Sequence, residues 1–166
     1  MDRLMPREKL RAMLDQVTRE ITRREAGIRL TLTEPGENGP VGDPCTVYIT
    51  FERGMDGTLC LCANGAMFVR IARAVMDTDA LTPQDVADVA KEYLNVLGGH
   101  VLRRLFPTAK RPARFSVPVF CRGPYAPEGE RLSIALDYAG DQAEQVRFSY
   151  YTPHGDENTW KEDVSV

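Results

Sequence analysis

The sequence predicts an α+β fold in which helices cover a mostly antiparallel sheet of about six strands. Three segments have the spacing of amphipathic helices, and six short segments alternate apolar and polar residues as half-buried strands do. The predicted order is helix, three strands, two helices and three strands, without the regular strand–helix alternation of a parallel sheet. A length of 166 residues suits a single domain over 1–166.

The three predicted helices are defined by their apolar faces and by the residues at their ends. Gly27 follows the first apolar pattern closely and is typical of a helix stop. The longest helix begins after Thr82, a capping residue, with Pro83 at its first position, and Phe106-Pro107 ends it. The predicted helices cover residues 7–24, 67–76 and 82–105.

The strands are defined by alternation with a period of two and by the turns between them. Asp56-Gly57 and Gly140-Asp141 have the composition of hairpin turns, and the Gly- and Pro-rich segment 34–44 predicts a loop. Pro118 falls inside the fourth predicted strand, between two valines expected to point inward, and a strand proline is confined to an edge or a bulge. The predicted strands are 28–33, 47–51, 58–62, 115–119, 132–138 and 146–150.

Bulk properties exclude several classes of function. The formal net charge of −3 argues against non-specific nucleic-acid binding, which requires a basic surface. No apolar segment approaches the roughly 20 residues needed to span a bilayer, and the first residues lack the apolar core of a signal peptide. We therefore expect a cytoplasmic protein that binds neither nucleic acid nor membrane.

The cysteines and histidines form no pattern typical of a metal site. There is no CxxC pair, and His100 and His154 stand apart from the cysteines and from each other. A closed zinc site usually needs clustered ligands, so we expect no metal and no cofactor bound by this chain. Reduced thiols are expected in the absence of a signal sequence. The four cysteines are Cys45, Cys60, Cys62 and Cys121.

A polar stripe runs along the longest predicted helix. Spacings of four, three and four residues place its members on one face, and a separate apolar face is expected to pack on the core. Such a stripe is most often only the solvated side of an amphipathic helix. The stripe consists of Asp88, Glu92, Asn95 and Gly99. The predicted core face consists of Val86, Val89, Ala90, Tyr93, Leu97 and Val101, with Arg104 at its margin.

Three residues of this helix are poor helix formers. Asn95 competes for backbone hydrogen bonds, and Gly98 and Gly99 together cost on the order of 2 kcal/mol relative to alanine. One interpretation is a flat surface that another backbone can approach and from which Glu92 and Asn95 project. The other interpretation is tight internal packing of the glycines against a strand.

The pattern Asp88-x3-Glu92-x2-Asn95-x22-Pro118 resembles the signature of the CheC/CheX/FliY chemotaxis phosphatases. CheC-type members typically carry two such motifs and CheX-type members carry one, so this chain resembles the CheX type. His100 stands where the family often has Asn. We interpret His100 as an ordinary boundary residue rather than a catalytic one.

The resemblance implies a phosphatase that hydrolyses the phosphoryl-aspartate of a CheY-type response regulator. Asn95 would enter the regulator's active site and orient the attacking water, and Glu92 would pair with the lysine of the phosphorylation pocket. The Mg²⁺ of that pocket is held by acidic residues of the regulator. The resemblance also implies a CheC-like or CheX-like fold and a homodimer formed through the sheets. The expected supporting residues are Asp88, Gly98, Gly99 and Pro118.

The main alternative is a non-catalytic interaction module of the same fold, which binds a response regulator or acts like the flagellar-switch domains related to this family. Those domains lack the Glu/Asn pair, so Glu92 and Asn95 favour catalysis. A basic cluster beyond the pair either attracts an acidic receiver domain or is a solvated helix end. This cluster consists of Arg103, Arg104, Lys110, Arg111 and Arg114.

Overall fold

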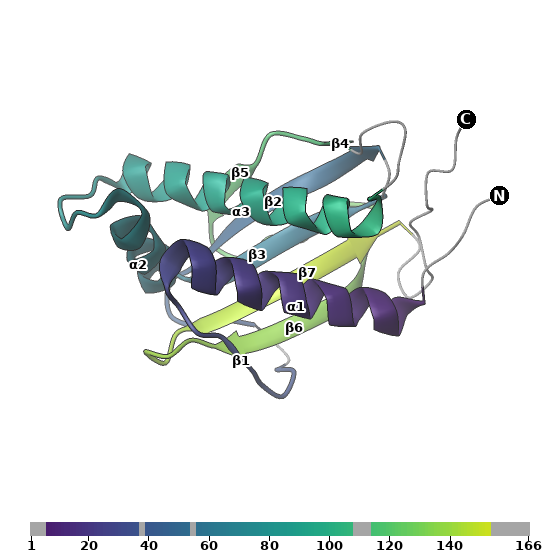
Figure 1. Ribbon diagram of the computed structural model, residues 1–166, viewed down its shortest axis with the longest axis horizontal. Coiled ribbons are helices and arrows are strands. Elements are labelled where there is room, and N and C mark those ends of the chain that lie inside the picture. Colours follow the sequence, from purple (N-terminus) through teal and green to yellow (C-terminus); the bar gives the residue numbers. More distant parts are fainter. Residues whose placement is uncertain (1–5, 37–38, 54–55, 108–113, 154–166) are drawn as a thin grey trace.

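The computed structural model describes residues 6–36, 39–53, 56–107 and 114–153, and has three helices packed on an antiparallel sheet of seven strands (Figure 1). The helices are α1 (Arg7–Ala26), α2 (Gly65–Met76) and α3 (Pro83–Leu105). The strands are β1 (Thr31–Leu32), β2 (Pro44–Arg53), β3 (Thr58–Asn64), β4 (Arg114–Phe115), β5 (Val119–Arg122), β6 (Arg131–Ala139) and β7 (Gln145–Thr152). The sheet order is β1-β6-β7-β3-β2-β4, and β5 also pairs with β2. The predicted α+β class is confirmed, with seven strands in place of six.

The helices begin and end at the predicted signals. Gly27 follows α1 in the left-handed conformation (φ 67°) and donates its N–H to the Arg23 carbonyl. At the start of α3, Thr82 and Asp85 each accept the other's backbone N–H through their side chains, in a capping box. Helices α1 and α3 run antiparallel, side by side, over one face of the sheet, with α2 at one end (Figure 1). Among the helices described, none is long and apolar enough to cross a membrane.

The core lies between the helices and one face of the sheet. Alternate residues of β2, β3, β6 and β7 point toward the helices and are fully buried, as the strand period requires. Each such side chain contributes about 1.5–3 kcal/mol by leaving water, so this layer fixes the height of the helices above the sheet. The sheet residues of this layer include Val47, Ile49, Leu59, Leu61, Leu136 and Phe148.

The fourth predicted strand is in fact two short strands, β4 and β5. Both strands pair with β2: Phe115 of β4 lies opposite Phe51, and Val119 of β5 lies opposite Tyr48. Three residues connect Phe115 to Val119, whereas only two lie between Tyr48 and Phe51 on β2, so the β4–β5 side contains a bulge. Pro118 lies in this bulge, because it lacks the N–H that a ladder needs. The prediction of an edge or bulge proline is confirmed. The inward orientation of its neighbours is wrong, since Val117 is 81% exposed and Val119 is 42% exposed.

The first predicted strand, 28–33, shortens to the two residues of β1. Ile28 and Leu30 are buried in the core without belonging to a strand. The alternation of apolar and polar residues in this segment therefore reflects the burial of side chains, and not hydrogen bonding to a neighbouring strand. β1 pairs with the last two residues of β6, so along much of the β6 edge no strand of the described residues lies beside it.

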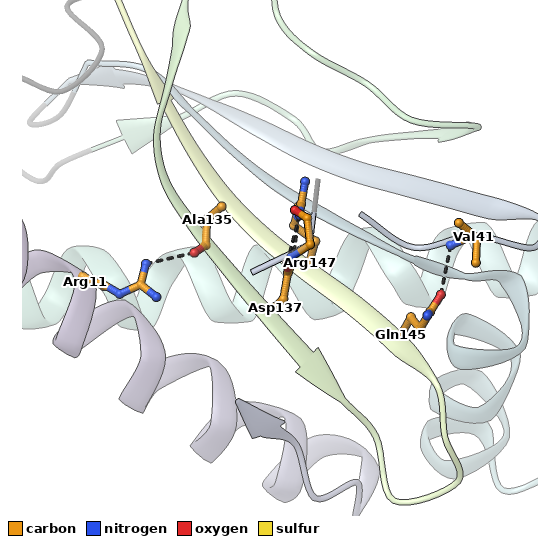
Figure 2. Close-up of polar contacts among 7 residues, drawn as sticks. Arg11, Val41, Ala135, Asp137, Gln145 and Arg147 are labelled. Carbon is orange, nitrogen blue, oxygen red and sulfur yellow. Dashed lines mark hydrogen bonds and ion pairs between the residues drawn. The ribbon is translucent and has the colours of Figure 1, made fainter. Parts of the chain in front are cut away.

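Helix α1 protects that part of the β6 edge. Arg11 donates to the Ala135 carbonyl at 2.9 Å (Figure 2), and Arg7 donates from Nε to the Ser133 carbonyl at 2.9 Å. These guanidinium groups satisfy carbonyl oxygens that an unprotected edge would offer to another strand. The helix and the edge strand are thus tied together by polar contacts as well as by the core.

Connecting segments cross the other face of the sheet, and none of the three helices described lies there. The segment before β2 is held by Arg147 of β7 and Asp137 of β6, whose side chains form a two-pronged ion pair with N–O distances of 2.6 and 2.9 Å (Figure 2). Asp137 also accepts the Gly36 N–H at 2.7 Å, and Arg147 donates to the Gly36 carbonyl. Val41 donates its N–H to the Gln145 side chain at 3.0 Å (Figure 2).

The segment between β5 and β6 crosses the same face above β2 and β3. The Tyr125 ring stacks on Tyr48 with centroids 3.8 Å apart, and the Thr46 hydroxyl donates to the Gly123 carbonyl at 2.8 Å. Burial of Tyr125, together with its contact to Tyr48, raises the Tyr125 pKa to about 12. Both faces of the sheet are thus covered, and α3 rests on a support that is packed from both sides.

Replacing Arg147 by Met leaves the largely buried Asp137 carboxylate without its cationic partner. We expect a loss of about 3 kcal/mol in the free energy of unfolding, measured by urea denaturation at pH 7. The double variant Asp137→Asn/Arg147→Met should lose less, because no buried charge remains unpaired. Arg131→Met, at an exposed position, is the control and should change stability by less than about 0.5 kcal/mol. Equal losses in the single and double variants would contradict this account.

Candidate functional site

The predicted polar stripe lies on the outer face of α3. Asp88, Glu92 and Asn95 are exposed and Gly99 is partly exposed, on the side of the helix opposite the core. The core face is wider than the sequence predicted, because Leu94, Leu102 and Leu105 are buried in the core as well. The buried residues of α3 are Val89, Ala90, Tyr93, Leu94, Leu97, Gly98, Val101, Leu102 and Leu105.

Glu92 and Asn95 project from adjacent turns of α3, three residues apart. Within the described part of the chain, neither side chain makes a hydrogen bond or an ion pair. A carboxylate and an amide held on a rigid helix, with no partner of their own there, are available to another molecule. Neither residue is a nucleophile held beside a base, so the pair has no complete reaction centre within α3.

Asp88 is engaged locally. It accepts a hydrogen bond from Gln84 at 2.8 Å and lies 3.7 Å from the Lys91 ammonium. Exposed pairs of this kind contribute little to stability. Asp88 therefore extends the acidic part of the stripe while its carboxylate is shared with neighbours on the same helix.

The two glycines have different surroundings. A Cβ on Gly98 would lie 2.5 Å from the Ile49 Cδ1 atom and 3.3 Å from the Phe115 ring, so Gly98 allows α3 to approach β2 and β4. A Cβ on Gly99 would meet no atom within 4 Å. The packing interpretation thus applies to Gly98 and the open-surface interpretation to Gly99. Pro118 lies between β4, which contains Phe115, and β5, and both of these strands pair with β2.

His100 has a partner that the sequence did not indicate. Its Nε2 atom lies 2.8 Å from Nη2 of Arg24, near the end of α1. Because a guanidinium can only donate, Nε2 must be the acceptor and the imidazole must be neutral, with its proton on Nδ1. Burial, followed by the nearby charges of Arg103 and Arg24, lowers the His100 pKa below its ordinary value. The two partners are 76 residues apart, and neither lies in a local motif.

The basic cluster divides into residues with different partners. Arg104 pairs with Glu20 of α1 at 3.4 Å and Arg114 pairs with Glu52 of β2 at 2.9 Å. Arg103 is exposed and forms no ion pair with any residue that the structure describes. The other two members, Lys110 and Arg111, lie outside the described residues.

Other features favour neither metal binding nor thiol chemistry. Over the described ranges, no group of three or more His, Cys, Asp or Glu residues is arranged to hold a metal ion. All four cysteines are free thiols, and burial raises the pKa of each. A groove of about 490 Å³ between α2, the start of α3 and β5 has Phe68 and Phe120 in its lining, and includes neither Glu92 nor Asn95.

Comparisons with known proteins identify one family. The family model "Chemotaxis phosphatase CheX" matches residues 45–129, just over half of the 166 residues. No curated protein matches the chain.

Several solved structures share the fold. A chemotaxis protein CheX from Desulfovibrio desulfuricans has a TM-score of 0.65 at 16% identity, covering 86% of this chain and 99% of that one. CheX from Vibrio vulnificus has a TM-score of 0.66 at 13% identity, covering 89% and 99%. The Borrelia burgdorferi CheX–CheY–BeF3–Mg²⁺ complex has a TM-score of 0.64 at 12% identity, covering 85% and 96%.

The two glycines provide a matched pair of variants. Gly99→Ala should raise the free energy of unfolding by up to about 1 kcal/mol, because alanine favours the helix and the space is open. Gly98→Ala should lower it by about 1 kcal/mol, because the clash with buried Ile49 outweighs the helical gain. Urea denaturation measures both, and Ile49→Val, which removes the clashing methyl group, should reduce the loss in Gly98→Ala. Equal effects of the two alanines would contradict this assignment.

The His100–Arg24 contact predicts the direction of a titration. NMR of the imidazole Cε1–H should give a His100 pKa below that of a free histidine, and Arg24→Gln should raise it by removing a nearby cation. With a lowered pKa, folded His100 binds fewer protons than His100 in the unfolded state. Its contribution to the free energy of unfolding is therefore fully present above the ordinary histidine pKa, and it is lost as the pH falls through the lowered pKa of the folded state. A His100 pKa unchanged by Arg24→Gln would contradict the contact.

Proposed function

This chain belongs to the chemotaxis phosphatase CheX family, and we propose that it accelerates hydrolysis of the phosphoryl-aspartate of a CheY-type response regulator. The observation that carries this proposal is the pair Glu92 and Asn95, exposed on the outer face of α3 without partners in the described chain. The fold shared with the CheX of the Borrelia burgdorferi CheX–CheY complex supports a regulator as the partner.

The chemistry suits a residue that positions water. A phosphoryl-aspartate is an activated acyl phosphate, and its transition state requires mainly an in-line nucleophile and stabilised charge. The Asn95 amide oxygen can accept a hydrogen bond from the attacking water and fix its direction, although an amide cannot remove the proton. The helix backbone holds Asn95 rigidly, and the open space at Gly99 one turn later lets the partner's backbone come close.

Glu92 acts on the partner rather than on the water. Its carboxylate projects one turn before Asn95 and can bind the lysine ammonium of the receiver pocket. This contact would align the receiver so that Asn95 enters beside the phosphoryl group. The Mg²⁺ would be held by acidic residues of the regulator, where it neutralises phosphoryl charge. Homodimerisation through the sheet stays a prediction, to be tested by light scattering.

Decay of phosphorylated regulator is the direct test. Each CheY-type regulator of the source organism is phosphorylated with a small-molecule donor, and its decay is followed with and without this protein. Asn95→Ala should reduce the acceleration by at least about 100-fold, because the water loses its positioning group. Glu92→Gln should lower kcat/KM by about tenfold, mainly by weakening binding.

Two controls make this result interpretable. Glu128→Gln removes an exposed carboxylate in the segment between β5 and β6, away from α3, and should leave the decay rate as in the wild type. Circular dichroism should show all variants folded. Wild-type acceleration that persists in Asn95→Ala would overturn the role of Asn95. Binding without acceleration for every regulator would instead support the non-catalytic module.

A further inference from the structure

The exposed stripe of α3 changes its charge along the helix. Its first half is acidic, with Asp88 and Glu92, and Arg103 provides a positive charge near the other end. Between them lie Asn95 and Gly99, which carry no charge. Arg103 is eight residues after Asn95, about 12 Å along the helix axis. A partner that covers this stripe therefore meets opposite charges at its two ends.

Helix α1 adds a second cation at the positive end. Arg24 reaches from the last turn of α1 to His100, which is one turn before Arg103 on α3. The Arg24 Nη2 atom donates to His100 at 2.8 Å, and its Nε atom lies 3.6 Å from Glu25. The neutral imidazole therefore holds the guanidinium against α3 without cancelling its charge.

We propose that Arg24, His100 and Arg103 form a basic lip of the docking surface, which binds carboxylate groups beside the phosphorylation pocket of the regulator. The proposal rests on the proposed function, because it takes the phosphorylated receiver as the occupant. It fits the charge pattern: when Glu92 faces the receiver's lysine, the lip lies more than two helical turns away, toward the end of α3.

The lip has a specific consequence for binding. Complementary charges at the rim of an interface raise the rate of association and fix the orientation of the partner more than they raise affinity. A receiver placed the other way along α3 would bring its lysine to Arg103 and its carboxylates to Glu92, and both contacts would be repulsive. The lip therefore selects the one orientation that brings Asn95 to the phosphoryl group.

His100 is a positioning residue in this account. Its neighbours on α1 and α3 are Arg24, Glu25, Arg103 and Arg104, so the ring lies among three cations and one carboxylate. Without an acceptor at position 100, Arg24 would keep only Glu25, which already lies 3.6 Å from its Nε atom and is the one acidic residue among these four. The charge of the lip would then be drawn away from the docking surface.

The test separates binding from catalysis. Decay of phosphorylated regulator is measured over a range of regulator and salt concentrations for the wild type, Arg24→Gln/Arg103→Gln and the control Arg29→Gln, an exposed arginine beside the edge strand β1. Binding of the beryllofluoride-activated regulator is measured in parallel. We expect the double variant to raise KM and Kd by about five- to tenfold, to keep kcat, and to lose most of the salt dependence.

A second set of variants tests His100. His100→Leu should raise KM by about twofold to fivefold in the wild-type background and have no further effect in Arg24→Gln, since the two residues act together. His100→Gln, which keeps an acceptor, should restore most of the binding. Circular dichroism checks that each variant is folded.

The outcomes distinguish the two proposals. If the wild type dephosphorylates the regulator and the double variant has the same KM and the same salt dependence as the wild type, the basic lip is overturned. The proposed phosphatase function is then unaffected. A lower kcat at unchanged KM would also overturn the basic lip, because the lip is a binding element. Failure of the wild type to bind or dephosphorylate any regulator would overturn the proposed function, and the basic lip with it.

Discussion

The close approach of α3 to the sheet at Gly98 is the contact on which the rest of the site depends. A side chain there would meet Ile49 and Phe115, so any larger residue would push the helix outward or rearrange the core. The approach sets the depth of α3, and the helix rotation that it requires points Glu92 and Asn95 away from the core. Packing on one side of the helix thereby determines what is offered on the other.

The support beneath α3 explains why one helix can carry a functional surface. The sheet is covered on its second face by connecting segments tied through Arg147, Asp137 and the stacked ring of Tyr125. On the first face, α1 is tied to the β6 edge through Arg7 and Arg11. A surface built on such a framework loses little conformational entropy on binding, which suits the proposed role of Asn95 in placing one water molecule.

The proposed active site is divided between two proteins. This chain contributes an amide, a carboxylate and an open glycine surface, whereas the regulator would contribute the phosphoryl group, the lysine and the metal ion. Orientation would then be the main task of the proposed interface, because Asn95 would act only if the receiver arrived in one direction. The change of charge along α3, from Glu92 to Arg103, would help to set that direction.

Much of the fold was predictable from local patterns. Helical spacing, the Thr82 cap and the Gly27 stop predicted the three helices, because these signals act within a few residues. The strand pattern failed where pairing and burial differ. Ile28 and Leu30 alternate because they are buried, and the predicted strand 115–119 is divided into β4 and β5, with its valines exposed. Alternation reports which residues leave water, and it does not report which strand lies beside them.

The sequence by itself determined which residues share the stripe on α3, because helix geometry converts spacing into a common face. It also carried the family pattern from Asp88 to Pro118. Only the tertiary structure decided that Gly98 faces the sheet while Gly99 is open, and that His100 is joined to Arg24. The physical reason is distance along the chain: each of these decisions depends on atoms tens of residues away, which no local spacing encodes.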